Sequence, residues 1–168
     1  MLVYDGDSGK GFFANSDSDH ASDPDSRRSQ TGYILKLAKG LVSWSFYLQK
    51  TVALSSTKAE YMALSDCCRQ VRWIINLLGE IGFPLFGFPL LGDNMGSIFM
   101  SNNQAQDRRT KHIDVRYHHI REVTESGLVS VYYIPTDQNV ADLLTKNLAW
   151  VKFKRFRDQL GLEFKAFR

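Results

Sequence analysis

The first fifty residues contain short aromatic and β-branched runs separated by polar residues, the pattern of strands and turns. Thr31–Leu37 and Leu41–Phe46 are two such runs, and Lys39-Gly40 stands between them. Because glycine favours turns, these three segments together predict a β-hairpin. The polar run Asp23–Ser29 predicts a loop that precedes the hairpin.

The apolar period then changes from that of a strand to that of a helix. Across Thr57–Leu78, apolar residues recur at intervals of three and four, which predicts a long amphipathic helix ending near Gly79. The same spacing predicts helices at Thr110–Ser126, Val140–Asn147 and Trp150–Leu160.

Two further strands are predicted in the second half of the chain. Leu128–Ile134 alternates between apolar and polar residues. Because Pro84 and Pro89 do not suit a central strand, the other strand is predicted to be short, over Leu90–Asp93. Strands first, followed by helices that alternate with strands, predict an α/β fold with a mixed sheet and helices on its faces.

Length and composition favour a single domain. The chain has 168 residues, 43% of them apolar, which is enough for one ordinary core. We expect one domain over residues 1–168, with a core at about 11–148 and a basic helix and tail at 149–168. The net charge of +3 is too small to indicate nucleic-acid binding by itself. Aspartates crowd the start and basic residues the end, which fits either an acidic metal centre beside a basic surface or two solvated stretches.

The cysteines and the apolar runs indicate a cellular location. Cys67 and Cys68 are adjacent in a predicted helix, where a disulfide between them would be strained. No apolar run reaches the roughly 18–20 residues that span a bilayer, and Met1–Asn15 lacks the features of a signal peptide. We therefore expect a soluble intracellular protein, cytoplasmic or nuclear, without a membrane partner.

Four carboxylates attract attention, although each has an ordinary structural explanation. Asp17 resembles a turn aspartate, and Thr57 with Glu60 has the spacing of a capping box. Asp93 is placed to cap a following helix. Asp142 falls in the first turn of another helix, where the helix dipole favours a negative charge. Singly, none of them indicates a catalytic site.

Taken in order, these carboxylates resemble the set found in the ribonuclease H family. A more specific resemblance, to the ribonuclease H domain of copia-type LTR retrotransposon Pol polyproteins, rests on five strings that together span nearly the whole chain. These are Ser16–Asp19, Asp23–Ser29, Gln49–Leu64, Thr110–His118 and Ala141–Lys146. The third and fourth strings are the most specific of the five.

The resemblance implies a ribonuclease H-like fold with a five-stranded mixed sheet, antiparallel hairpin strands first and parallel strands after. It also implies an endonuclease that hydrolyses the RNA strand of RNA/DNA hybrids during retrotransposon reverse transcription. The implied partner is a reverse transcriptase domain, N-terminal in the parent polyprotein. In the parent element the implied location is a cytoplasmic virus-like particle.

The implied site consists of Asp17, Glu60, Asp93 and Asp142, acting as catalytic residues and as ligands of two Mg²⁺ ions, for which Mn²⁺ can substitute. By resemblance, Asp17 bridges both ions, Asp142 lies on the water-activating side, and Glu60 and Asp93 lie on the leaving-group side. Two divalent ions about 4 Å apart suit phosphodiester hydrolysis, and Mg²⁺ prefers oxygen ligands. Without metal, four neighbouring carboxylates would raise each other's pKa values.

Candidate substrate contacts follow from the positions of basic and amide residues near this implied site. Arg27, Arg28 and Lys111 are placed to contact backbone phosphates, although solvated surface charge explains them nearly as well. Selection of a hybrid over a DNA duplex depends on 2′-hydroxyl contacts and minor-groove shape, and Asn94 is the candidate donor.

The sequence also departs from the family pattern. His20 and Ser22 stand where the family usually has Trp and Gly, and Pro89 shortens a strand. The loop Ile134–Asn139 lacks the histidine of cellular members, as it does in the copia branch, so slower or differently assisted turnover is expected. Two alternatives stay open. One is a domesticated nucleic-acid-binding or interaction module that is catalytically weak or inactive, and the other is a nuclease of the same fold that prefers DNA.

Overall fold

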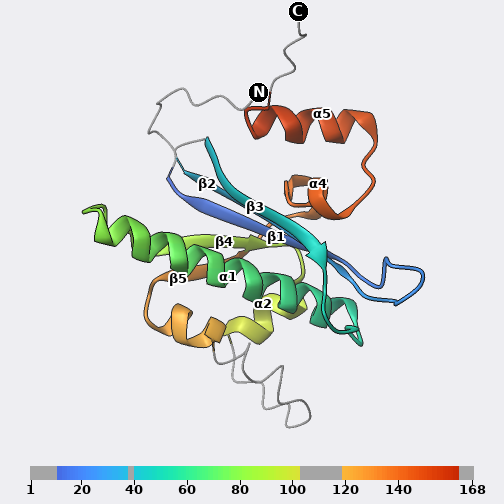
Figure 1. Cartoon of the computed structure of the whole chain (residues 1–168), viewed down its shortest axis with the longest axis horizontal. Helices are drawn as coiled ribbons and strands as arrows, with labels where there is room; N and C mark the ends of the chain where they lie inside the picture. The colour runs from blue at the N-terminus through green and yellow to red at the C-terminus, as the bar shows by residue number, and fades with distance from the viewer. Residues whose placement is uncertain (1–10, 38–39, 103–118, 163–168) are drawn as a thin grey trace, which may run out of the picture.

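A five-stranded mixed sheet forms the centre of the computed structural model, which describes residues 11–37, 40–102 and 119–162 (Figure 1). The strands are β1 (Phe13–Asp19), β2 (Gln30–Leu37), β3 (Gly40–Leu48), β4 (Phe88–Gly92) and β5 (Val129–Tyr133). Their order is β3-β2-β1-β4-β5. The first three strands are antiparallel, whereas β4 runs parallel to both β1 and β5. The predicted hairpin and mixed sheet are therefore confirmed.

The helices differ from their predicted bounds mainly at their ends. They are α1 (Ser56–Glu80), α2 (Met95–Asn102), α4 (Asp142–Thr145) and α5 (Trp150–Gln159), with a short 3-10 helix η1 (Thr136–Gln138). The predicted helix at Val140–Asn147 is only the single turn α4. Of the predicted helix at Thr110–Ser126, residues 119–125 are helical, and 110–118 lie outside the described residues. No helix in the described segments is both long enough and apolar enough to cross a membrane.

Helices cover both faces of the sheet, which explains why consecutive strand residues are buried. Leu35 packs in the larger core with α1, β1, β4 and β5, whereas its neighbour Ile34 packs in a second core with Phe156 of α5. Because successive strand side chains point to opposite faces, these two cores lie on opposite sides of the sheet. Accordingly, α1 runs along one face while α4 and α5 lie on the other (Figure 1).

The fourth strand does not follow the prediction of a strand over Leu90–Asp93. It spans Phe88–Gly92 and contains Pro89, although it lies between two other strands. The Phe88 backbone N–H donates to the Leu128 carbonyl, on the β5 side of the strand. The backbone of Pro89, the next residue, therefore faces β1. Pairing with β1 begins only at Leu90, so the missing N–H of the proline removes no hydrogen bond from that ladder.

Candidate active site

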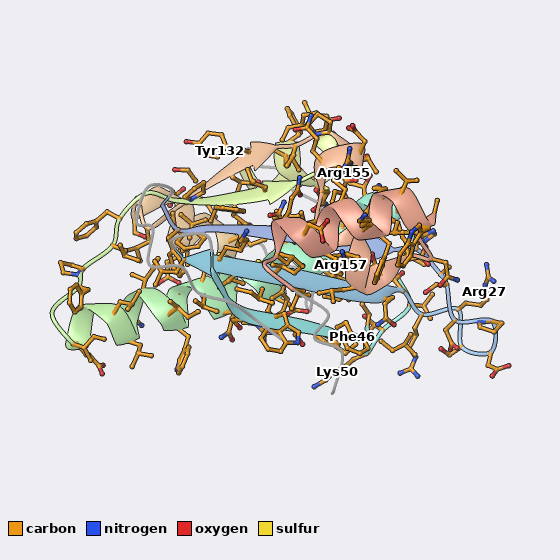
Figure 2. The ribbon with its side chains drawn as sticks, turned by 90° about the horizontal axis from the view of Figure 1, so that it is seen from above. Arg27, Phe46, Lys50, Tyr132, Arg155 and Arg157 are labelled. Atoms are coloured by element: carbon orange, nitrogen blue, oxygen red, sulfur yellow. The ribbon has the colours of Figure 1, made fainter. Side chains whose placement is uncertain are left out.

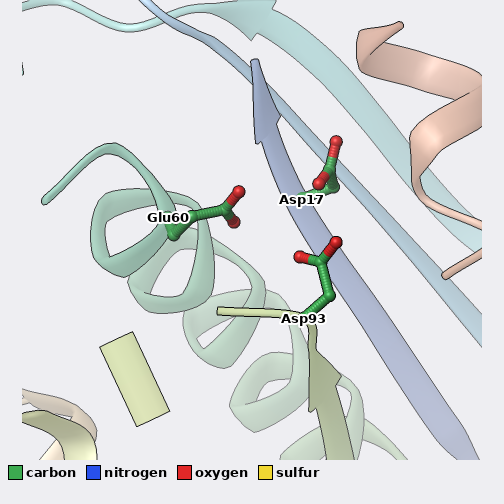
Figure 3. Close-up of side chains that lie close together, drawn as sticks. All are labelled: Asp17, Glu60 and Asp93. Atoms are coloured by element: carbon green, nitrogen blue, oxygen red, sulfur yellow. The ribbon is translucent and has the colours of Figure 1, made fainter. Parts of the chain in front are cut away.

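Three of the four predicted carboxylates come together at one end of the sheet. Asp17 lies on β1, Glu60 lies on α1, and Asp93 directly follows β4 (Figure 3). One carboxylate oxygen of each residue lies within 4.8 Å of the others. Asp17 and Glu60 are buried and Asp93 is half-buried. Side chains from three elements, spread over more than seventy positions of the chain, thus form one acidic cluster.

Glu60 is available to the cluster because another residue caps α1. The Ser55 side chain is the N-cap and accepts a hydrogen bond from the Lys58 backbone N–H at 3.2 Å. Glu60 therefore lies beyond the capping position. The capping-box interpretation of Thr57 and Glu60 is wrong, because the N-cap is Ser55, two residues before Thr57.

A similar exchange of roles occurs between Asp93 and Asn94. The side-chain oxygen of Asn94 accepts a hydrogen bond from the Ser97 backbone N–H at 2.9 Å and caps α2. Asp93 therefore does not cap the helix, and its carboxylate faces the cluster. An added side chain at Gly96 would lie 2.9 Å from a methyl carbon of Thr57, so glycine lets the first turns of α2 and α1 approach closely.

Asp142 stands apart from this cluster and is linked to Asp17 through a lysine. Lys146 Nζ lies 2.9 Å from Asp17 Oδ1 and 2.7 Å from Asp142 Oδ1. Lys152 Nζ lies 2.5 Å from Asp142 Oδ2, and the Thr145 hydroxyl donates to Asp17 Oδ2. The structure therefore places Asp142 next to Asp17 but not within the compact group of three.

The position of α4 depends on a glycine in the neighbouring strand. Gly32 of β2 pairs with Asp17 of β1. A Cβ atom at this glycine would lie 2.7 Å from Thr145 Cγ2 and 2.9 Å from Leu144 Cβ, which is too close for carbon atoms. Glycine thus lets α4 lie directly against the sheet, where its side chains reach Asp17.

A buried asparagine holds the segment that leads into α4. The Asn139 side-chain amide donates to the Ser16 carbonyl of β1 at 2.9 Å. Its side-chain oxygen accepts a hydrogen bond from the Ala141 backbone N–H at 3.2 Å. Because both contacts are buried, they tie the residues before Asp142 to the strand that carries Asp17.

Burial and crowding shift the pKa values of the carboxyl groups in the cluster. Burial, with the nearby carboxylates of Asp17 and Asp93, raises the pKa of Glu60 to about 9. Burial also raises the pKa of Asp17, even though Lys146 and Thr145 act in the opposite direction. Burial by itself would lower the pKa of Lys146, but Asp17 and Asp142 outweigh it and raise that pKa. Without a cation, the site therefore disfavours the charged forms of Glu60 and Asp17.

The donor set fits a hard divalent cation. Asp17, Glu60 and Asp93 offer oxygen ligands only, as Mg²⁺ and Mn²⁺ prefer, and a cation among them would counter the burial and the carboxylate repulsion that raise the Glu60 pKa. Asp142 and Asp17 could share a cation only at the position between them, which Lys146 Nζ occupies.

The predicted substrate contacts are not brought to the cluster as a group. Arg27 is exposed at the outer tip of the β1–β2 loop (Figure 2), where its backbone has a positive φ of 55°. Arg28 Nε donates to Ser26 Oγ at 2.8 Å within the same loop. Asn94 uses its side-chain oxygen as a helix cap, and Lys111 lies outside the described residues. Their roles toward a nucleic acid stay predictions.

The sequence analysis missed three residues that contact the predicted aspartates: Thr145, Lys146 and Lys152. A signal existed for Lys146, which follows Asp142 by four residues, a spacing that brings opposite charges together on a helix. Two basic residues of the predicted C-terminal helix make contacts within the protein. Lys152 forms an ion pair with Asp142, and Arg155 donates to the Asp137 carbonyl.

Solved structures with this architecture identify the fold. A ribonuclease H1 from the archaeon Halobacterium salinarum superimposes with a TM-score of 0.54 and 18% identity, covering 81% of this chain and 95% of that one. LC11-RNase H1 in complex with an RNA/DNA hybrid gives 0.59 and 13%, covering 80% and 93%. The fold is that of ribonuclease H. The foamy viral protease-reverse transcriptase in complex with an RNA/DNA hybrid contains the same fold in part, with a TM-score of 0.56 and 14% identity over 83% of this chain and 20% of that one.

Sequence comparison relates this ribonuclease H fold to mobile elements, although no family model matches the chain. It is 40% identical over 146 residues to the retrovirus-related Pol polyprotein from transposon TNT 1-94 of Nicotiana tabacum, and 39% identical over 150 residues to that from transposon RE2 of Arabidopsis thaliana. These alignments cover 87% and 89% of this chain but only 11% and 10% of the relatives. The chain is thus homologous to about a tenth of each Pol polyprotein.

Proposed function

We propose that this chain is the ribonuclease H domain of a copia-type retrotransposon Pol polyprotein and hydrolyses the RNA strand of RNA/DNA hybrids with Mg²⁺ or Mn²⁺. The observation that carries the proposal is the convergence of Asp17, Glu60 and Asp93 within 4.8 Å in a ribonuclease H fold. The similarity to plant transposon Pol polyproteins supports the biological setting.

The chemistry of the site suits a phosphodiester. The substrate repels an attacking oxygen and releases a negatively charged one, and divalent ions supply the positive charge that both steps need. Asp17, Glu60 and Asp93 would hold one ion, and Asp17 with Asp142 would hold a second. Thr145 donates to Asp17 Oδ2 and so orients the carboxylate shared by both positions.

The partner and location are part of the same proposal. Two solved structures with this fold are complexes with RNA/DNA hybrids, and one of them is a protease-reverse transcriptase. We therefore place a reverse transcriptase domain N-terminal to this chain in the parent polyprotein. Its setting would be a virus-like particle in the cytoplasm, or the nucleus.

Cleavage of a labelled hybrid tests the proposal with wild type, Asp17→Asn and the control Asp25→Asn, an exposed aspartate in the β1–β2 loop. Wild type and the control should cleave with Mg²⁺ or Mn²⁺ and not with chelator. Asp17→Asn should lose cleavage by about 100-fold or more while still binding the hybrid.

Three results would contradict the proposal. Cleavage unaffected by chelator would refute metal dependence. Preference for a DNA duplex over the hybrid would favour the DNA nuclease. Hybrid binding without cleavage under every condition would favour a domesticated binding module.

A further inference from the structure

Lys146 fills the space between the carboxylates of Asp17 and Asp142. Its Nζ atom lies 2.9 Å from one and 2.7 Å from the other, within hydrogen-bond distance of both. The remaining oxygens of the pair are also occupied, since Thr145 donates to Asp17 Oδ2 and Lys152 to Asp142 Oδ2. All four oxygens of these two buried aspartates therefore accept a hydrogen bond.

The other side of Asp17 has the opposite character. Within the part of the chain that the structure describes, neither Glu60 nor Asp93 forms an ion pair with a lysine or arginine. Their carboxylates face Asp17 across the acidic cluster (Figure 3). Asp17 thus separates a half-site that lacks a counter-charge from a half-site that already holds a cation.

An ammonium and a divalent ion cannot occupy the second half-site together. Mg²⁺ binds carboxylate oxygens at about 2.0–2.1 Å, so an ion bridging Asp17 and Asp142 would take the place of Lys146 Nζ and repel its charge. The lysine side chain is 31% exposed, and its flexible stem gives it a route outward to solvent.

We propose that Lys146 acts as a built-in competitor for the second divalent ion. One ion binds readily among Asp17, Glu60 and Asp93, whereas a second enters between Asp17 and Asp142 only when the lysine leaves. This inference rests on the proposed function and deepens it. Lys146 sets the ion concentration at which the second position fills.

Titration of the nucleic-acid-free protein with Mn²⁺ tests the idea, with free ion followed by electron paramagnetic resonance. Wild type should bind one ion tightly and a second much more weakly. Lys146→Met should bind the second ion at least about tenfold more tightly than wild type. Lys154→Met, which changes an exposed lysine of α5, is the matched control and should titrate as wild type does.

A second variant keeps the test decisive if Lys146→Met does not fold, which melting in chelator would show. Lys146→Gln can still donate a hydrogen bond but carries no charge, so it should also strengthen second-ion binding. Unchanged second-ion affinity in the folded variants would overturn the proposal, as would two equally tight ions in wild type. An inactive wild type that titrates as expected would refute only the proposed function, and an active one whose variants titrate unchanged would refute only the role of Lys146.

Discussion

Replacing Gly32 with alanine tests whether the position of α4 controls both stability and the site. The added Cβ would meet Thr145 Cγ2 at 2.7 Å and Leu144 Cβ at 2.9 Å. Carbon atoms pack best at about 3.5–4.0 Å, so α4 must withdraw by about 1 Å. Both close contacts are on α4 itself, so the helix has to move as a unit.

The expected cost follows from this overlap. Overpacking of this kind lowers the free energy of unfolding by about 1–3 kcal/mol. For a domain of this size that corresponds to a fall in melting temperature of roughly 2–12 °C. Because α4 carries Asp142 and precedes Lys146, a displacement of about 1 Å should also slow hybrid cleavage by up to about 100-fold.

Urea denaturation and single-turnover cleavage measure the two effects, and Gly79→Ala is the matched control. Gly79 lies in the last turn of α1, and a Cβ there meets nothing within 4 Å. Alanine should therefore leave cleavage unchanged and stabilise the helix by up to about 1 kcal/mol. Wild-type stability in Gly32→Ala would refute the packing argument. Lower stability with unchanged cleavage would refute the link between α4 and the site.

Three further predictions concern charge and packing. In metal-free protein the Glu60 pKa of about 9 exceeds its ordinary value of 4.5, so the folded state binds more protons between these pH values and its stability falls as pH rises. Melting in chelator should show this slope reduced in Glu60→Gln, and an unchanged slope would exclude Glu60 as its source. Asn139→Ala should lose about 1–3 kcal/mol in urea denaturation by removing the buried donor to Ser16, and a wild-type unfolding curve would argue against that anchor. Phe156→Ala removes a fully buried side chain and should lower the free energy of unfolding by about 3–5 kcal/mol. Phe153 is 37% exposed, so Phe153→Ala should lower it by less than about 1 kcal/mol. Equal losses would contradict the role of Phe156 in the second core.

Local patterns predicted most of the sheet and the long helix. The hairpin of β2 and β3 and the apolar stripe of α1 follow from periods of two and of three to four residues, which depend on backbone geometry alone. Element ends were less predictable. Ser55 rather than Thr57 caps α1, and β4 includes Pro89, because capping and strand pairing depend on neighbours that the local pattern does not contain.

The order of the four carboxylates, and their resemblance to a ribonuclease H set, were readable from the sequence. So was the spacing of four residues between Asp142 and Lys146. The contact between Lys146 and Asp17 joins residues 129 positions apart and forms only because Gly32 admits α4 to the sheet. Tertiary structure alone therefore decided which carboxylates form the acidic cluster and which share a lysine, since both depend on how closely distant backbones pack.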